Sequence, residues 1–107
     1  MAMVNRFDVY LINLDEQVSK DAKNTRPAVV VSPDEVNNNL NSVIVAPISS
    51  TNARYPTRVP VDFLNSRRFV ILDQVQTIDS KRLVKKVGAL DREAQVRITE
   101  CLLELFA

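Results

Sequence analysis

Short runs of β-branched and other apolar residues follow one another along most of this chain, and the one long helical pattern appears only after they end. The run at 6–14 mixes apolar and β-forming residues, and 28–31 is a continuous run of the kind buried on both faces of a sheet. Because strands come first and the helix last, without βαβ alternation, the sequence predicts a mainly β fold. We expect a small barrel or strongly bent antiparallel sheet, capped by a C-terminal helix. Further short strands are expected at 43–46, 57–61, 69–72, 75–78 and 84–87.

Two features predict the C-terminal helix, an N-cap residue and a stripe of apolar residues along one helix face. Asp91 is a suitable N-cap, and the apolar residues after it recur at helical spacing. We expect the stripe to pack on the sheet, with Cys101 as a small buried side chain and not a reactive thiol. Val96, Leu103 and Phe106 form a second facet, which is either further core or a surface for a partner. The stripe consists of Ala94, Ile98, Cys101, Leu102 and Leu105.

A shorter helix is predicted after residue 31. Ser32 is a potential N-cap, Pro33 suits the first helical position, and Glu35 completes a capping box three residues after the cap. The asparagines at 37–39 favour turns over a helix interior, so this helix should be short.

Prolines and one polar stretch mark the expected strand boundaries. Pro47 should close the strand at 43–46, and Pro60, which cannot donate to a ladder, indicates an edge strand. Residues 15–25 are mostly polar and have no periodicity, and Arg26-Pro27 ends them. We expect a long exposed loop there, which is a candidate for function, with disorder as the alternative.

Composition bounds the organisation of the chain. Its 107 residues are 46% hydrophobic and 25% charged, which fits one compact domain spanning 1–107. The longest apolar stretches, 27–31, 43–48 and 102–106, fall far short of the roughly 20 residues that a bilayer requires. We expect no transmembrane helix, no secretory signal and a cytoplasmic location.

Missing residue types exclude several chemistries. With no histidine and one cysteine, the chain lacks the usual zinc and copper ligands, and also the commonest acid–base side chain. Its single glycine, Gly88, excludes glycine-rich phosphate loops. We therefore expect neither a metal nor a cofactor.

The charges are unevenly distributed although the net charge is only +1. Residues 49–68 carry +3, residues 80–90 carry +4, and residues 93–107 carry −2. A basic face opposite an acidic one and two ordinary solvated surfaces are equally good interpretations.

Polar residues follow three of the predicted strands or loops. They are Arg26, Ser49-Ser50-Thr51 and Asp73-Gln74. Taken singly, each could be a solvated loop residue, a turn former or a partner for backbone amides. Taken together, they lie within longer sequence blocks that resemble the motifs of a known family.

Five sequence blocks, in order, resemble the MazF/PemK/Kid family of toxin endoribonucleases. The family's Arg-Gly-Asp-Val-Tyr, Arg-Pro-x-Val-Val, Pro-Ile-Thr-Ser and Pro-Thr-x-Val blocks, and its Asp/Glu-Gln-Ile-Arg-Thr-Ile-Asp-Lys-x-Arg-Leu block, each have a counterpart. The chain departs from the family at Phe7 and Ser49, which replace Gly and Thr, and at Glu16, Ser19 and Asp21 in the first loop, where the family usually has Pro, Gly and Glu. The counterparts are Arg6-Phe7-Asp8-Val9-Tyr10, Arg26-Pro27-Ala28-Val29-Val30-Val31, Ala46-Pro47-Ile48-Ser49-Ser50, Tyr55-Pro56-Thr57-Arg58-Val59, and residues 73–83.

The resemblance implies an SH3-like barrel of the PemK/CcdB type, a homodimer, and cleavage of single-stranded RNA, usually messenger RNA. It also implies an antitoxin whose acidic, flexible tail lies along the RNA groove. Carried over from the family motifs, the catalytic residues are Arg26, Ser49 and Asp73.

The chemistry of these residues agrees with that implication. Metal-independent RNA cleavage needs attack by the 2′-hydroxyl, which leaves a 2′,3′-cyclic phosphate and a 5′-hydroxyl, and positive charge for the phosphorane oxygens. Arg26 suits the charge through its planar fork, Ser49 could bind a phosphate oxygen, and Asp73 could accept the proton. RNA binding is expected from Lys20, Lys23, Asn24, Thr25, Ser50, Thr51, Arg54, Tyr55 and Gln74.

Two other functions stay open at this stage. The changes at Ser49 and in the first loop allow a catalytically weak or inactive relative that binds RNA or antitoxin. The same barrel also serves CcdB-like gyrase poisons, but these rely on a C-terminal tryptophan, whereas this chain ends Leu105-Phe106-Ala107 and contains no tryptophan.

Overall fold

The computed structural model describes residues 3–13, 25–50 and 56–107. They form a mainly β structure that ends in a helix, as the sequence predicts. The strands are β1 (Asp8–Asn13), β2 (Thr25–Val30), β3 (Ser42–Ser49), β4 (Arg58–Phe63), β5 (Ser66–Ile71), β6 (Gln76–Asp79) and β7 (Leu83–Ala89). The helices are α1 (Asp34–Asn39) and α2 (Arg92–Phe106), with short 3-10 turns η2 (Leu72–Gln74) and η3 (Ser80–Arg82).

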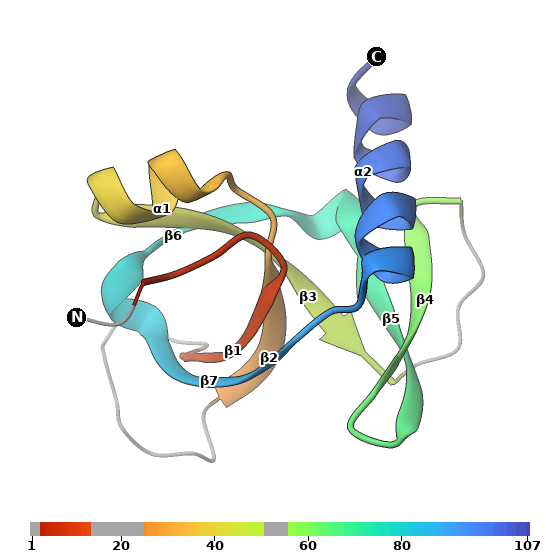
Figure 1. The fold of residues 1–107 in the computed structure, drawn as a ribbon, viewed down its shortest axis with the longest axis horizontal. Coiled ribbons are helices and arrows are strands. Elements are labelled where there is room, and N and C mark those ends of the chain that lie inside the picture. The colour runs from red at the N-terminus through yellow and green to blue at the C-terminus, as the bar shows by residue number, and fades with distance from the viewer. Residues whose placement is uncertain (1–2, 14–24, 51–55) are drawn as a thin grey trace.

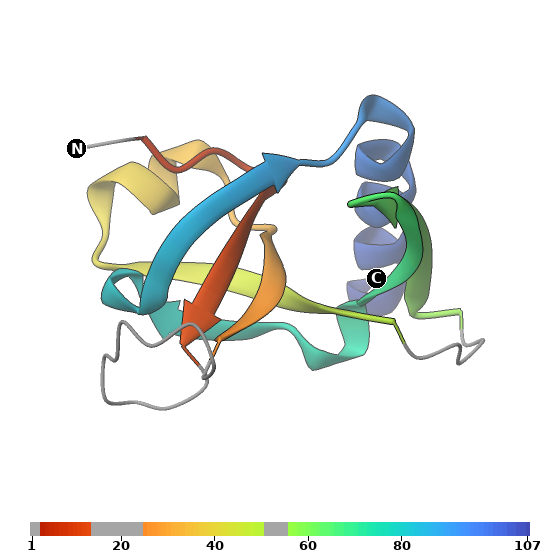
Figure 2. The ribbon, with the colours of Figure 1, turned by 90° about the horizontal axis from the view of Figure 1, so that it is seen from below.

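These strands make one curled antiparallel sheet. Its order is β4-β5-β3-β2-β1-β7, and β6 pairs with β3 beside this path. β3 joins the two halves, because residues 45–47 pair with β2, residues 42–45 with β6, and residues 48–49 with β5. Figures 1 and 2 show the sheet bending round on itself, with α2 against the side formed by β4 and β5. The SH3-like barrel with a C-terminal helix expected from the sequence is confirmed, and it takes the form of a curled antiparallel half-barrel.

The central strands are buried on both faces. Successive residues of a strand point to opposite faces, and two hydrophobic clusters divide accordingly. Val9 and Val29 belong to the cluster that contains Ile98 of α2. Val30 belongs to the other cluster, with Ile78 of β6. The two-sided burial predicted for residues 28–31 is therefore confirmed, since all four are 5% exposed or less.

The two edge strands of the sheet approach each other at the single glycine. A Cβ atom on Gly88 of β7 would lie 2.9 Å from Cε1 of Phe63, the last residue of β4. Only a residue without a side chain lets the ring come so close. The prediction that Pro60 lies in an edge strand is confirmed, because β4 is at one end of the strand order.

Two predicted strand boundaries are wrong, for one physical reason. β3 continues through Pro47 to Ser49, and β2 begins before Pro27, so that Arg26 lies in a strand and not at a loop end. Pro27 is paired with Leu11 of β1. Pairing with a neighbouring strand decides where a strand ends, and a proline is tolerated where its missing N–H is not needed by a ladder.

The capping box predicted at Ser32 is also wrong. Pro33 is the N-cap of α1 and makes no side-chain cap hydrogen bond. The buried Ser32 hydroxyl instead donates to Oδ1 of Asn37 and accepts from the backbone N–H of Ile44 at 3.0 Å, which ties α1 to β3. The predicted shortness of this helix is confirmed, since it ends at Asn39.

α2 begins as predicted, with the Asp91 carboxylate accepting from the backbone N–H of Ala94 at 2.9 Å. Its apolar stripe packs against the core as far along the helix as Leu102. Leu105 is 37% exposed, and Figure 1 shows the last turns of the helix extending beyond the sheet. The second facet is exposed, with Phe106 reaching 72%. None of the helices in the described parts of the chain is long and apolar enough to cross a membrane.

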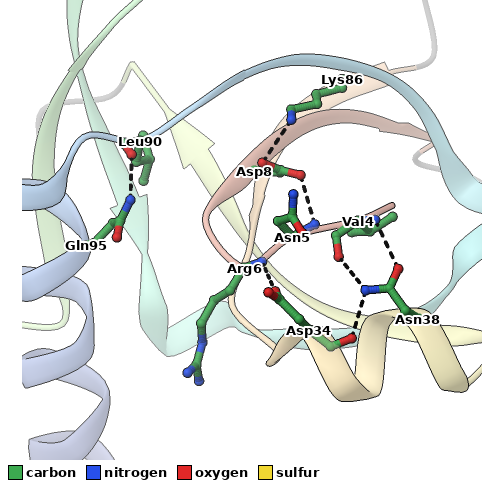
Figure 3. A network of polar contacts seen from close by, with 9 residues as sticks. All are labelled: Val4, Asn5, Arg6, Asp8, Asp34, Asn38, Lys86, Leu90 and Gln95. Atoms are coloured by element: carbon green, nitrogen blue, oxygen red, sulfur yellow. Dashed lines mark hydrogen bonds and ion pairs between the residues drawn. The ribbon is translucent and has the colours of Figure 1, made fainter. Parts of the chain in front are cut away.

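The segment before β1 is held by α1. Figure 3 shows the backbone N–H of Arg6 donating to Oδ1 of Asp34, at 2.7 Å. The Asn38 amide donates to the carbonyl of Val4 at 3.1 Å and accepts from its N–H at 3.2 Å. Side chains of α1 thus hold Val4 and Arg6, whereas Phe7 is held by backbone hydrogen bonds with Val30 and Leu90.

A buried carboxylate completes this end of the barrel. Asp8 is 3% exposed, and its oxygens accept from the backbone N–H of Asn5 at 2.9 Å and pair with Nζ of Lys86 at 3.2 Å (Figure 3). Phe7, at the position where the resembling family has glycine, has a φ of +73°, in the left-handed region that favours glycine.

Candidate active site

Two of the three predicted catalytic residues flank the point where β2 and β3 separate. The pairing of these strands ends at Ala28 and Pro47. Beyond that pair, β1 is the one described strand with which β2 remains paired, whereas β3 continues along β5. Arg26 and Ser49 each lie two residues past the last shared pair, at the same end of the sheet. In Figure 2 the start of β2 lies near the lower edge of the molecule, and the end of β3 lies farther to the right, beside β5.

Arg26 presents an accessible cation at this end. Its side chain is exposed, and Nη1 donates to the carbonyl of the preceding residue, Thr25, at 3.1 Å. This contact to a neutral backbone group leaves the charge available for a phosphate, which a guanidinium binds through its planar fork of donors.

Ser49 is the last residue of β3 and stands opposite Phe69 of β5. Its side chain is half-buried, and the next residue, Ser50, is exposed. A hydroxyl at a strand end, held by a paired backbone, is positioned more accurately than one on a free loop.

The other residues predicted to bind RNA differ in their exposure to solvent. Gln74 in η2 is exposed, like Ser50, whereas Thr25 is 8% exposed and so offers little surface. Lys20, Lys23, Asn24, Thr51, Arg54 and Tyr55 lie outside the described residues.

Asp73 lies in a separate polar cluster at the start of β4. Its Oδ1 accepts from the Thr57 hydroxyl at 2.9 Å and lies 3.8 Å from Nε of Arg58. In α2, burial chiefly, and after it the charges of Glu104 and Asp73, raise the pKa of the Cys101 thiol. Asp73 therefore joins η2 to the start of β4, and its side chain is still 39% exposed.

The basic segments are partly engaged in internal contacts. In 49–68, Arg67 pairs with Asp62 at 3.0 Å, and Arg68 donates to the carbonyl of Phe63 at 3.0 Å. In 80–90, Lys81 and Lys85 are exposed, whereas Lys86 pairs with the buried Asp8. A basic face built from these segments is therefore smaller than the net charges alone suggest. No group of three or more potential metal ligands occurs within 3–13, 25–50 and 56–107.

Arg82 is a residue of this end that the sequence reasoning did not single out. Its guanidinium donates to the backbone carbonyl of Asn13, from Nε at 3.0 Å and from Nη2 at 2.5 Å. The available signal was the arginine of the fifth block, Asp-x-x-Arg-Leu, which Arg82 matches. Thr57, the partner of Asp73, was equally visible in the fourth block.

Comparisons with known proteins agree with the fold and the motifs. The family described as "PemK-like, MazF-like toxin of type II toxin-antitoxin system" matches residues 5–106. Endoribonuclease EndoA of Bacillus subtilis (strain 168) is 32% identical over 109 residues, which cover 94% of this chain and 91% of that protein.

Solved structures give the same result. The Mycobacterium tuberculosis toxin MazF-mt6 superposes with a TM-score of 0.77 at 27% identity, over 92% of this chain and 95% of that chain. A MazE-MazF structure from Deinococcus radiodurans has a TM-score of 0.82 over 100% of this chain and 98% of that chain. Its 18% identity makes it evidence for the fold alone.

Proposed function

The chain belongs to the PemK-like, MazF-like toxin family of type II toxin-antitoxin systems and is an endoribonuclease, and we propose that it cleaves single-stranded messenger RNA in the cytoplasm without a metal. The observation that carries this proposal is the pair Arg26 and Ser49 at the end of the sheet where β2 and β3 separate. An accessible guanidinium and a hydroxyl on paired strands suit a phosphate that gains negative charge as it reacts.

The reaction we propose is an internal transfer of the phosphoryl group. The 2′-hydroxyl oxygen forms a bond to the adjacent phosphorus and loses its proton, while the bond from phosphorus to the 5′-oxygen breaks. The departing 5′-oxygen takes up a proton, so the products are a 2′,3′-cyclic phosphate and a 5′-hydroxyl. Arg26 stabilises the charge on the phosphorane oxygens, and Ser49 donates a hydrogen bond to one of them.

Asp73 is the third residue of the proposal, as the acceptor of the 2′-hydroxyl proton. Its carboxylate is partly exposed to solvent, and Thr57 and Arg58 contact it. A carboxylate needs hydrogen-bond reach to its proton, directly or through one water. Comparing Asp73→Asn with Thr57→Val separates this role from a purely structural one.

The products and the nucleophile provide the direct test. A long RNA cut by the purified protein should give fragments whose masses fit 2′,3′-cyclic phosphate and 5′-hydroxyl ends, with excess EDTA present. A 2′-deoxy nucleotide at the mapped cut should abolish cleavage and reduce binding far less, because only the nucleophile is missing. Fragments with 3′-hydroxyl and 5′-phosphate ends, or activity lost on chelation, would contradict the mechanism.

We propose two protein partners, a second copy of this chain and an antitoxin with an acidic, flexible tail. Exposed apolar side chains on α2, such as Leu103 and Phe106, offer a surface for association. The exposed Lys81 and Lys85 offer charge to an acidic tail. Sedimentation should give the mass of a dimer, and the association rate of an acidic antitoxin peptide should fall as salt rises. A rate that is independent of salt would argue against a basic docking surface.

A further inference from the structure

We propose that Arg82 is a positioning residue for Arg26, because it fixes the end of the strand pair on which Arg26 lies. This inference rests on the proposed function, in which Arg26 stabilises the reacting phosphate. Arg82 belongs to η3, far from Arg26 in sequence, and the topology brings the two to the same end of the sheet.

The first step of the argument is the point where β1 loses its partner strand. The pairing of β1 with β7 ends at Ile12 and Leu83. One residue further, the chain of β7 has turned into η3, so no backbone N–H of β7 continues the ladder. The Arg82 guanidinium supplies two donors to the carbonyl of Asn13 instead, at 3.0 and 2.5 Å. A side chain thus replaces the ladder for the last residue of β1.

The contact with Arg82 fixes Asn13 through its backbone. Asn13 is 1% exposed, and among the described residues neither polar atom of its side-chain amide has a hydrogen-bond partner. A buried amide without partners does not hold a strand end. Charge-assisted hydrogen bonds from a planar guanidinium are roughly twice as strong as neutral ones, and they fix direction as well as distance.

The second step leads from Asn13 to Arg26. Asn13 is paired with Thr25, the first residue of β2, and the Thr25 carbonyl accepts from Nη1 of Arg26 at 3.1 Å. At this end β2 has β1 as its only partner among the described strands, because its pairing with β3 stops at Ala28. If Asn13 becomes more mobile, Thr25 moves with it, and so does the Arg26 guanidinium that is hydrogen-bonded to Thr25. A displacement of about 1 Å in a group that stabilises a transition state costs a large part of its effect.

The test compares Arg82→Ala and Arg82→Lys with Arg68→Ala. Arg68 makes the same type of contact, from Nε to the backbone carbonyl of Phe63 at 3.0 Å, but in the β4–β5 hairpin, so it is a matched control for the structural loss. The measurements are single-turnover cleavage at saturating RNA, affinity for an RNA with a 2′-deoxy nucleotide at the cut, and the midpoint of thermal unfolding.

We expect Arg82→Ala to slow cleavage about tenfold and to change the affinity for 2′-deoxy RNA less than threefold. Arg82→Lys, which keeps the charge and one directed donor, should recover part of the rate, and it serves alone if the alanine variant does not fold. Arg68→Ala should stay within twofold of wild type even though its unfolding midpoint falls.

A double-mutant cycle gives the decisive readout. In an Arg26→Ala background, Arg82→Ala should cause little further loss, because the group that it positions is gone. Additive losses, equal losses for Arg82→Ala and Arg68→Ala, or a loss of affinity with an unchanged rate would overturn the positioning role. If wild-type protein cuts no RNA, or Arg26→Ala is fully active, the proposed function fails too; an active Arg82→Ala beside an inactive Arg26→Ala refutes this inference alone.

Discussion

The two ends of strands β1 and β2 use their charged groups differently. At the end near Asp8, a buried carboxylate has a partner for each oxygen, and the chain before it is fastened to α1. At the end near Asn13, Arg26 is exposed, and within the described part of the chain its guanidinium donates to the neighbouring carbonyl of Thr25. The first arrangement holds the fold together, whereas the second leaves a cation for a ligand. Charged residues of one sheet can thus be classified by whether the protein itself supplies a partner for their charge.

The strongest test of this difference is Arg26→Ala. We expect cleavage to slow about a hundredfold, which corresponds to about 3 kcal/mol of transition-state stabilisation. The free energy of unfolding should differ from that of wild type by less than about 0.5 kcal/mol, as is usual for a substitution on the surface. Single-turnover cleavage and urea denaturation measure the two effects. Arg67→Ala is the matched control, since Arg67 forms an exposed ion pair with Asp62 that is worth little. Activity within threefold of wild type in Arg26→Ala would contradict its assignment.

Asp73 belongs to neither end and sharpens the comparison. If its carboxylate accepts the 2′-hydroxyl proton, Asp73→Asn should slow cleavage about thirtyfold, while Thr57→Val, which removes its hydrogen-bond donor, should slow it less than threefold. The two variants should lose similar stability, about 1 kcal/mol each. Cleavage rates and denaturation of both proteins decide the matter. Equal and small effects on the rate would mean that Asp73 only joins β4 to η2.

The Asp8 end should respond in the opposite way to Arg26. Asp8→Ala leaves the N–H of Asn5 and the ammonium of Lys86 without their partner, so the free energy of unfolding should fall by about 2 kcal/mol. Cleavage, measured well below the unfolding midpoint, should remain within twofold of wild type. Lys86→Ala should cost less, because that side chain is 47% exposed. A large loss of activity without a loss of stability would remove the distinction between the two ends.

The smallest effect is expected at Ser49. Ser49→Ala should slow cleavage about tenfold, close to 1.4 kcal/mol, through loss of one hydrogen bond to the phosphate. Ser49→Thr should preserve or raise the rate, since a β-branched residue suits a strand end and has fewer rotamers. The ratio of the two rates is the measurement. A marked loss in the threonine variant would show that the two hydroxyls do not occupy equivalent positions.

Local patterns in the sequence predicted the parts of this structure that depend on neighbouring residues. The strand runs, the edge strand at Pro60 and the start of α2 at Asp91 are of this kind, because alternation, a missing N–H and a cap act within a few residues. The order of strands before helix predicted the mainly β fold, and ordered motifs identified the family.

The wrong predictions share a dependence on distant partners. Ser32 has the sequence context of a helix cap, but its hydroxyl accepts a hydrogen bond from the backbone N–H of Ile44, twelve residues away. Pro47 looks like a strand end, but β2 pairs with it. Part of the helical stripe predicted to pack is exposed at Leu105, because the sheet beneath α2 ends first.

The sequence by itself determined the element types, the family and the identity of the chemical groups, since all of these are carried by residue type and short-range spacing. Only the tertiary structure decided which groups share an end of the sheet. Arg26 and Ser49 each lie two residues past the last pair that β2 and β3 share, Asp73 accepts a hydrogen bond from Thr57, and Arg82 donates to the last residue of β1. Strand pairing is a non-local choice, made by the burial of both faces of the sheet, and no short segment of the chain contains it.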